Sequence, residues 1–198
     1  MTADVHATDG RVLVVCTGNI CRSPYIERSL AQALGDAPIS VESAGLGAVV
    51  GAPIHPPSAK RLRAQGISPD GFAARQLTME MLLSADLIVG AAQEHVDALV
   101  ATAGVARHKS FTYRELAYLL RGVSDHDITD GPASPRAQRV ALAAARQRGR
   151  VPMLKRTDAD IADPYLQPEA VYDAMITQVN EGLPDLVAAL RSLDKERV

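Results

Sequence analysis

A cysteine and an arginine, Cys16 and Arg22, enclose five residues directly after the aliphatic run at residues 12–15. The run predicts a buried central strand, and residues 17–19 permit a tight turn. Pro24 suits the first turn of a helix, where its missing N–H is not needed. The loop therefore joins the carboxyl end of a strand to a helix N-terminus, where unpaired backbone N–H groups and the helix dipole bind anions.

The chemistry predicted for this loop is attack on a phosphate group. Arg22 supplies a planar fork that can hold two oxygens of one anion. Cys16 faces the same positive field, so the thiolate should be favoured over the thiol. We expect phosphate, sulfate or another oxyanion to occupy the site, and no other cofactor. We expect no metal, because the histidines lack metal-ligand spacing: His6, His55, His95, His108 and His126.

Residues 16–24 read Cys-Thr-Gly-Asn-Ile-Cys-Arg-Ser-Pro, which resembles the signature of the low-molecular-weight protein tyrosine phosphatase family in its bacterial form. Asp163-Pro164-Tyr165 matches the family's Asp-Pro-Tyr loop. By this resemblance Cys16 is the nucleophile, Arg22 is the clamp, Asp163 is the general acid and then the base, and Tyr165 lines the substrate cleft. The resemblance assigns phosphate binding or loop support to Thr17, Gly18, Asn19, Ile20, Cys21, Ser23 and Ser43.

Three of these residues have a more detailed implied role. The resemblance implies that Ser23 donates a hydrogen bond to the Cys16 sulfur, and that Ser43 holds Asn19 in the left-handed conformation that asparagine tolerates. Cys21 is either a small apolar filler of the loop or the partner of Cys16 in a disulfide formed after oxidation by peroxide. For Arg75, within the similar segment 74–77, an ion pair or packing role is favoured over substrate contact.

The chain departs from the family beside the cleft. Many members carry a tryptophan after Ser-Ala-Gly, whereas this chain has none and places Val49 in that region. Residues 90–92 are also smaller than usual. We therefore expect phosphate chemistry to be retained with altered or broader substrate choice: hydrolysis of phosphotyrosine, or of other aryl or small phosphate monoesters, through a phosphocysteine on Cys16. The expected partner is a phosphotyrosine protein or a small aryl phosphate.

Two alternative functions stay open. An arsenate reductase that uses an external low-molecular-weight thiol could be built on the same loop, since arsenate mimics phosphate. Asp163 speaks against it, because arsenate has no aryl leaving group to protonate. A phosphate-binding or phosphotyrosine-binding pseudoenzyme is the second alternative, and the intact Cys16, Arg22 and Asp163 speak against it.

Alternating strand and helix patterns predict a single α/β domain of flavodoxin-like, doubly wound form. Its central parallel sheet has four strands, or five at most, with helices on both faces. The domain spans residues 11–193, between a flexible extension at 1–10 and a tail at 194–198. Expected strands are 11–15, 39–42, 87–89 and 107–111; expected helices are 24–34, 57–65, 78–84, 94–102 and 113–121. Pro184 should bend or divide the last helix.

Composition excludes several classes of protein. The 198 residues carry a net charge of −2, which does not suggest nucleic-acid binding. No run approaches the ~18 apolar residues of a membrane span, and residues 1–10 lack the apolar core of a signal peptide. Two cysteines do not make a disulfide scaffold. We expect a cytoplasmic monomer that does not bind membranes.

Residues 136–156 hold seven basic residues and no acidic one. One interpretation is a solvated helix balanced by acidic residues at 125, 127 and 130. The other is a docking surface for acidic phosphopeptides, which would act mainly on the association rate.

Overall fold

The computed structural model describes residues 9–130 and 133–191. The expected extension at 1–10 therefore lies almost entirely outside the described residues, and the expected tail at 194–198 lies wholly outside them. All strands described belong to one parallel sheet of four strands in the order β2-β1-β3-β4, which confirms the predicted flavodoxin-like sheet. The strands are β1 (Arg11–Cys16), β2 (Ser40–Gly45), β3 (Leu87–Gly90) and β4 (Ser110–Thr112).

The central position of β1 explains its aliphatic composition. Val14 pairs with Ser43 of β2 on one side and with Val89 of β3 on the other. Both faces of β1 are covered, so alternation with polar residues is absent. Cys16 pairs with Gly45 at the carboxyl edge of the sheet, where β1 ends and the loop begins.

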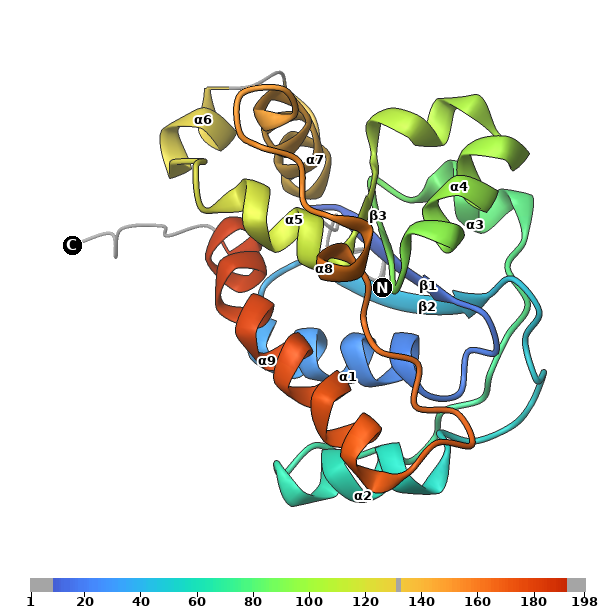
Figure 1. The fold of residues 1–198 in the computed structure, drawn as a ribbon. Helices are drawn as coiled ribbons and strands as arrows, with labels where there is room; N and C mark the ends of the chain where they lie inside the picture. Colours follow the sequence, from blue (N-terminus) through green and yellow to red (C-terminus); the bar gives the residue numbers. More distant parts are fainter. Residues whose placement is uncertain (1–8, 131–132, 192–198) are drawn as a thin grey trace, which may run out of the picture.

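Helices cover both faces of the sheet, as predicted (Figure 1). One face packs Val12 and Val14 against α1, α5, α7 and α9, and the other packs Leu13 and Val15 against α3, α4 and a 3-10 turn. The helices are α1 (Arg22–Leu34), α2 (Pro56–Ala64), α3 (Met79–Ser84), α4 (Gln93–Thr102), the turn η1 (Gly104–His108), α5 (Tyr113–Leu120), α6 (Asp125–Thr129), α7 (Arg136–Gln147), α8 (Arg156–Ala159) and α9 (Glu169–Leu190).

Pro184 does not divide α9, so of the two outcomes expected from the sequence, a bend or a division, the division is wrong. Proline removes the hydrogen bond to the carbonyl of Asn180, but Asn180 and Pro184 are both exposed, so solvent can reach this part of the helix. The apolar stripe on the opposite side stays buried: Met175, Val179, Leu186 and Leu190. Burial of that stripe outweighs the lost hydrogen bond.

The strand expected at 107–111 is also corrected. Residues 104–108 form the 3-10 turn η1, and extended backbone begins only at Ser110. The N–H of Lys109 bonds back to Ala106 at 3.1 Å, which keeps the chain coiled until that point. The short helices α6 and α8 were not predicted, because five and four residues are too few to show an apolar period.

The basic segment at 136–156 is not simply solvated. Arg136 is 1% exposed, and its guanidinium donates to the Ala189 carbonyl at 2.8 Å and to Asp125 at 2.5 Å. Arg148 lies over the Phe111 ring at 4.2 Å and forms an ion pair with Glu115. The solvated-helix interpretation is therefore wrong for Arg136, which joins α7 to the end of α9.

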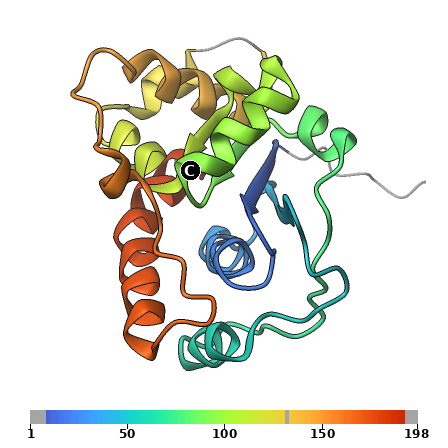
Figure 2. The same ribbon diagram turned by 45° about the vertical axis from the view of Figure 1, so that its right-hand side comes forward.

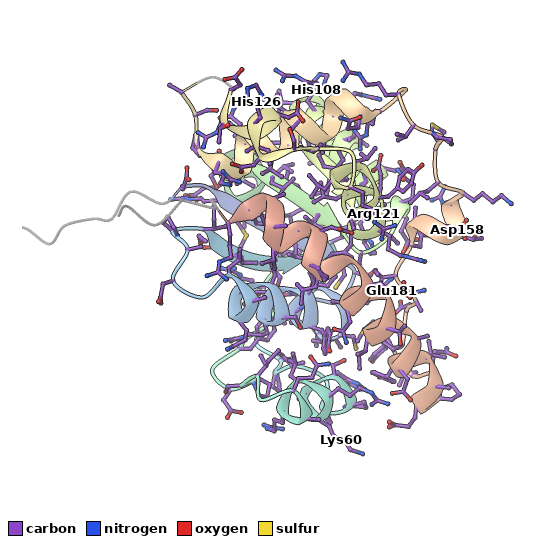
Figure 3. All side chains as sticks on the ribbon, turned by 90° about the vertical axis from the view of Figure 1, so that its left-hand side faces the viewer. Lys60, His108, Arg121, His126, Asp158 and Glu181 are labelled. Atoms are coloured by element: carbon purple, nitrogen blue, oxygen red, sulfur yellow. The ribbon has the colours of Figure 1, made fainter. Side chains whose placement is uncertain are left out.

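Surface charges are spread over opposite ends of the molecule. Figure 3 shows Lys60 at the end formed by α2 and His126 at the far end, with Glu181 of α9 between them. In the described part of the chain, no helix is long and apolar enough to cross a membrane.

Candidate functional site

The phosphate loop, residues 16–22, connects β1 to α1. Its Asn19 has a φ of 53°, the left-handed conformation that the sequence analysis expected, and its backbone N–H points at the Cys16 sulfur at 3.3 Å. Helix α1 begins at Arg22, and Cys21 before it provides no side-chain cap. The backbone N–H groups in the first turn of α1 can therefore donate hydrogen bonds to an anion bound in the loop.

A buried network holds the loop in this shape. Asn19 Nδ2 donates to Ser23 Oγ at 2.9 Å and to Ser43 Oγ at 2.8 Å, and Asn19 Oδ1 accepts from the Arg75 N–H at 2.9 Å. Ser43 Oγ in turn donates to Glu27 Oε2 at 2.5 Å. Burial raises the pKa of Glu27. Glu27 was missed from the sequence, although it lies one helical turn after Ser23.

Ser23 is placed to donate to the nucleophile. Its Oγ lies 2.9 Å from the Cys16 sulfur. Because the same oxygen accepts from Asn19, its own proton is free to point at the sulfur. Both hydrogen bonds implied by the family resemblance, Ser23 to Cys16 and Asn19 to Ser43, are thus present.

Asp163 reaches the loop from the segment before α9. Arg22 Nη2 lies 2.8 Å from Asp163 Oδ2, with the two side chains 5% and 52% exposed. The Ile161 N–H bonds to the Ala91 carbonyl at 2.8 Å, and the Ala162 N–H bonds to Gln178 at 2.8 Å. These bonds fix the segment against the end of β3 and against α9. In Figure 1 this segment, in orange, descends beside the blue loop at the start of α1.

One cavity brings most of the candidate residues together. Its volume is about 250 Å³, and Val49 and Tyr165 stand on its walls as expected. Asn19, Ser23 and Ser43 lie buried beneath it as supports. The cavity is lined by Cys16, Thr17, Gly18, Ile20, Cys21, Arg22, Gly47, Val49, Asp163 and Tyr165.

His95 is a part of the site that the sequence did not identify. Its Nδ1 accepts from the Ala92 N–H at 2.9 Å, so the ring proton sits on Nε2, which donates to Thr17 Oγ1 at 3.0 Å. Burial and the nearby Arg22 lower the pKa of His95 to about 4, which keeps the ring neutral. His95 comes shortly after β3, the strand beside β1. This position in the sequence was the signal that could have placed His95 near the phosphate loop.

An aromatic group supports the cleft beside Tyr165. The rings of Tyr165 and His55 meet edge to face at 5.6 Å, and the Tyr172 hydroxyl lies 2.9 Å from His55 Nδ1. Burial and the neighbouring Cys21 raise the pKa of Tyr172 to about 12. Burial and Cys16 likewise raise the pKa of Cys21 to about 12, so Cys21 stays a thiol.

Arg75 lies outside the cavity, as the sequence analysis favoured. Its guanidinium donates to the Ser43 carbonyl at 2.9 Å and forms an ion pair with Glu42 at 3.2 Å. Across residues 9–130 and 133–191, no group of three His, Cys, Asp or Glu side chains could hold a metal ion.

Comparison with known proteins agrees with this geometry. The sequence model of the family described as low molecular weight phosphotyrosine protein phosphatase matches residues 11–132. Etp of Escherichia coli strain K12, a low molecular weight protein-tyrosine-phosphatase, is 40% identical over 102 residues, which cover 52% of this chain and 68% of Etp. YfkJ of Bacillus subtilis strain 168, of the same description, is 40% identical over 126 residues, or 61% of this chain and 78% of YfkJ.

Solved structures extend the similarity to nearly the whole fold. The tyrosine phosphatase amsI of Erwinia amylovora superposes with a TM-score of 0.65 and 26% identity, covering 93% of this chain and 95% of that one. The low molecular weight protein tyrosine phosphatase of T. tengcongensis gives 0.64 and 27%, covering 90% and 97%. The chain therefore belongs to the low molecular weight phosphotyrosine protein phosphatase family, and it is a phosphatase.

Proposed function

We propose that this phosphatase hydrolyses phosphotyrosine in polypeptides, and small aryl phosphates, through a phosphocysteine on Cys16. The observation that supports this most is the convergence of Cys16, Arg22 and Asp163 on one cavity, although Arg22 and Asp163 lie 141 residues apart in the chain. A nucleophile, a clamp for the oxygens and a proton donor are the parts that phosphoryl transfer from a phenol requires.

In the first step the Cys16 thiolate attacks phosphorus in line with the bond to the phenol oxygen. The sulfur–phosphorus bond forms as the phosphorus–oxygen bond breaks. Arg22 and the loop amides stabilise the charge on the remaining phosphoryl oxygens. The carboxyl group of Asp163 transfers its proton to the departing phenolate, so phenol leaves as a neutral molecule.

In the second step a water molecule replaces the phenol. The Asp163 carboxylate takes a proton from this water as its oxygen attacks phosphorus. The sulfur–phosphorus bond breaks, phosphate leaves, and the thiolate of Cys16 is restored. Ser23 donates a hydrogen bond to the departing sulfur, which eases this step.

The ion pair between Arg22 and Asp163 adds a requirement to this cycle. Arg22 Nη2 lies 2.8 Å from Asp163 Oδ2, so a bound phosphate competes with Asp163 for the guanidinium. A phosphate dianion on Arg22 displaces the Asp163 carboxylate, which then faces the negative charge of the substrate. Substrate binding must therefore release Asp163 from Arg22 before Asp163 can act on the phenol oxygen.

We also propose a location and a working form for the enzyme. The cytoplasm suits it, because Cys16 and Cys21 are both free and a reducing compartment keeps Cys16 available. The residues that line the cavity come from one chain, so a monomer is sufficient. The catalytic steps proposed here use side chains and backbone amides of this chain, without a metal or cofactor. Relatives that are named phosphatases favour hydrolysis over arsenate reduction or simple phosphate binding.

The fold alone does not determine whether the substrate carries its phosphate on tyrosine or on arginine. YwlE of Geobacillus stearothermophilus, titled an arginine phosphatase, shares the fold with a TM-score of 0.64 at 24% identity. The test therefore compares matched phosphotyrosine and phosphoarginine peptides, together with p-nitrophenyl phosphate, on the wild type, Cys16→Ser and Asp163→Asn. We expect turnover of phosphotyrosine that is abolished in Cys16→Ser and falls at least about a hundredfold in Asp163→Asn. Turnover that survives Cys16→Ser, or that favours phosphoarginine, would contradict the proposal.

A further inference from the structure

Exposed apolar side chains gather at the mouth of the catalytic cavity. Eight large apolar side chains are exposed among the described residues, and four of them form two adjacent pairs, each containing a residue of the cavity wall. Val49 and Val50, 50% and 69% exposed, form the first pair, and Tyr165 and Leu166, 46% and 78% exposed, form the second. We call these four residues the apolar rim.

The first pair is fixed relative to the phosphate loop. The N–H of Gly47 bonds to the Thr17 carbonyl, and the N–H of Val49 bonds to the Gly18 carbonyl, each at 3.0 Å. The N–H of Gly51 bonds to the Ala74 carbonyl at 2.8 Å. Figure 2 shows the loop after β2 running beside the segment before α3 on one edge of the molecule. The valines are thus held next to the phosphate loop.

The second pair sits on a turn closed by the bond from the Gln167 N–H to the Pro164 carbonyl at 3.0 Å. Leu166, the third residue of this turn, has a φ of 58°. Glycine and asparagine adopt this conformation freely, whereas leucine is disfavoured there. Leu166 has a strained backbone and is 78% exposed, so its side chain adds no core packing to the stability of the fold. Stability therefore does not explain why a leucine occupies this position.

Two charged residues line the cavity, and neither belongs to the apolar rim. Arg22 and Asp163 are the charged residues among those that line it, and the basic segment at 136–156 contributes none. The rim itself is uncharged. Acidic or basic side chains of a substrate would lose water against the rim without gaining a partner, whereas aliphatic side chains would gain from burial there.

We propose that the apolar rim binds the residues next to phosphotyrosine in a substrate polypeptide, so that the enzyme selects phosphotyrosine flanked by large aliphatic side chains. This inference rests on the proposed function and names the substrate class of the same cavity. Contact with Val49 and Val50 on one side and with Tyr165 and Leu166 on the other would orient the chain while Arg22 holds its phosphate. Docking of acidic phosphopeptides on the basic segment stays a separate prediction, which favours the opposite peptide.

The test uses two phosphotyrosine peptides that differ only beside the phosphotyrosine, one with leucine and one with glutamate on both sides. We expect kcat/KM to favour the leucine peptide about tenfold on the wild type. Leu166→Asn keeps a residue that tolerates the left-handed conformation, and Val50→Thr keeps the side-chain shape. Each variant should lower the preference about threefold and leave turnover of p-nitrophenyl phosphate unchanged. Met153→Gln is the matched control, since Met153 is 91% exposed and lies outside the cavity.

The outcomes separate this inference from the proposed function. Equal kcat/KM for the two peptides on the wild type would overturn the role of the rim while phosphotyrosine hydrolysis stands. That role is also overturned if Leu166→Asn lowers kcat/KM for both peptides equally, or if Met153→Gln reduces the preference as much as the rim variants do. Failure of the wild type on every phosphotyrosine compound would instead refute the proposed function.

Discussion

Replacing Ser23 with alanine tests how the loop releases its sulfur. Ser23 Oγ lies 2.9 Å from the Cys16 sulfur and accepts from Asn19, so its hydroxyl proton faces the sulfur. Breakdown of the phosphocysteine returns negative charge to that sulfur, and a hydrogen bond to a charged group contributes about 2 kcal/mol. Loss of the bond in Ser23→Ala should therefore slow breakdown of the intermediate about thirtyfold.

The assay is rapid mixing with p-nitrophenyl phosphate. In Ser23→Ala we expect a burst of one p-nitrophenol per enzyme, because formation of the phosphocysteine is affected less than its hydrolysis. A slow steady state should follow the burst. Asn19 keeps its bond to Ser43 at 2.8 Å, so the loop should stay folded, which thermal unfolding checks.

The matched control for this experiment is Ser84→Ala. Ser84 is exposed at the end of α3 and is absent from the lining of the cavity. Its replacement should leave both phases unchanged. The proposed role of Ser23 is wrong if Ser23→Ala keeps the wild-type steady-state rate, or if it loses both phases equally with an intact fold.

Three further predictions concern stability and oxidation. The folded-state pKa of His95 is about 4, below its ordinary 6.5, so unfolding takes up a proton between pH 4 and pH 6.5. The neutral His95 therefore contributes about 3 kcal/mol to the free energy of unfolding above pH 6.5, and this contribution is lost as the pH falls toward 4. Urea unfolding of His95→Gln should show a flatter pH profile over that window. A Cβ at Gly182 would lie 2.8 Å from the Tyr113 ring, so Gly182→Ala should destabilise the fold by about 1–3 kcal/mol in the same assay, and an unchanged midpoint would contradict this packing. If Cys21 is the disulfide partner of Cys16, mild peroxide should give a linked peptide by mass spectrometry, whereas the filler interpretation predicts oxidised Cys16 without a link.

The sequence predicted the features that depend on neighbouring residues. The loop from Cys16 to Pro24 is local, and its strand, turn and helix signals lie within a few residues of one another. The parallel sheet followed from alternating patterns. The motif at Asp163 was found by its resemblance to a family loop, while its place beside Arg22 required the structure.

Features that depend on distant contacts could not be predicted. His95 forms a hydrogen bond with Thr17 only because β1 and β3 are neighbours in the sheet. No local sequence pattern predicts that strand order. Asp125 was among the acidic residues expected to balance Arg136, but Arg136 looked solvated because its other partner, the Ala189 carbonyl, lies 53 residues away in the chain. For Pro184, local propensity favoured a bend or a division, and burial of the apolar stripe keeps α9 undivided.

The most direct test of the central claim is to identify the residue that carries the phosphoryl group during turnover. Enzyme mixed with a phosphotyrosine peptide is quenched within its turnover time and examined by peptide mass spectrometry. We expect a phosphoryl group on Cys16 in the wild type, a larger fraction in Ser23→Ala and none in Cys16→Ser. A phosphoryl group on another residue, or turnover by an enzyme whose Cys16 is never phosphorylated in either form, would contradict it.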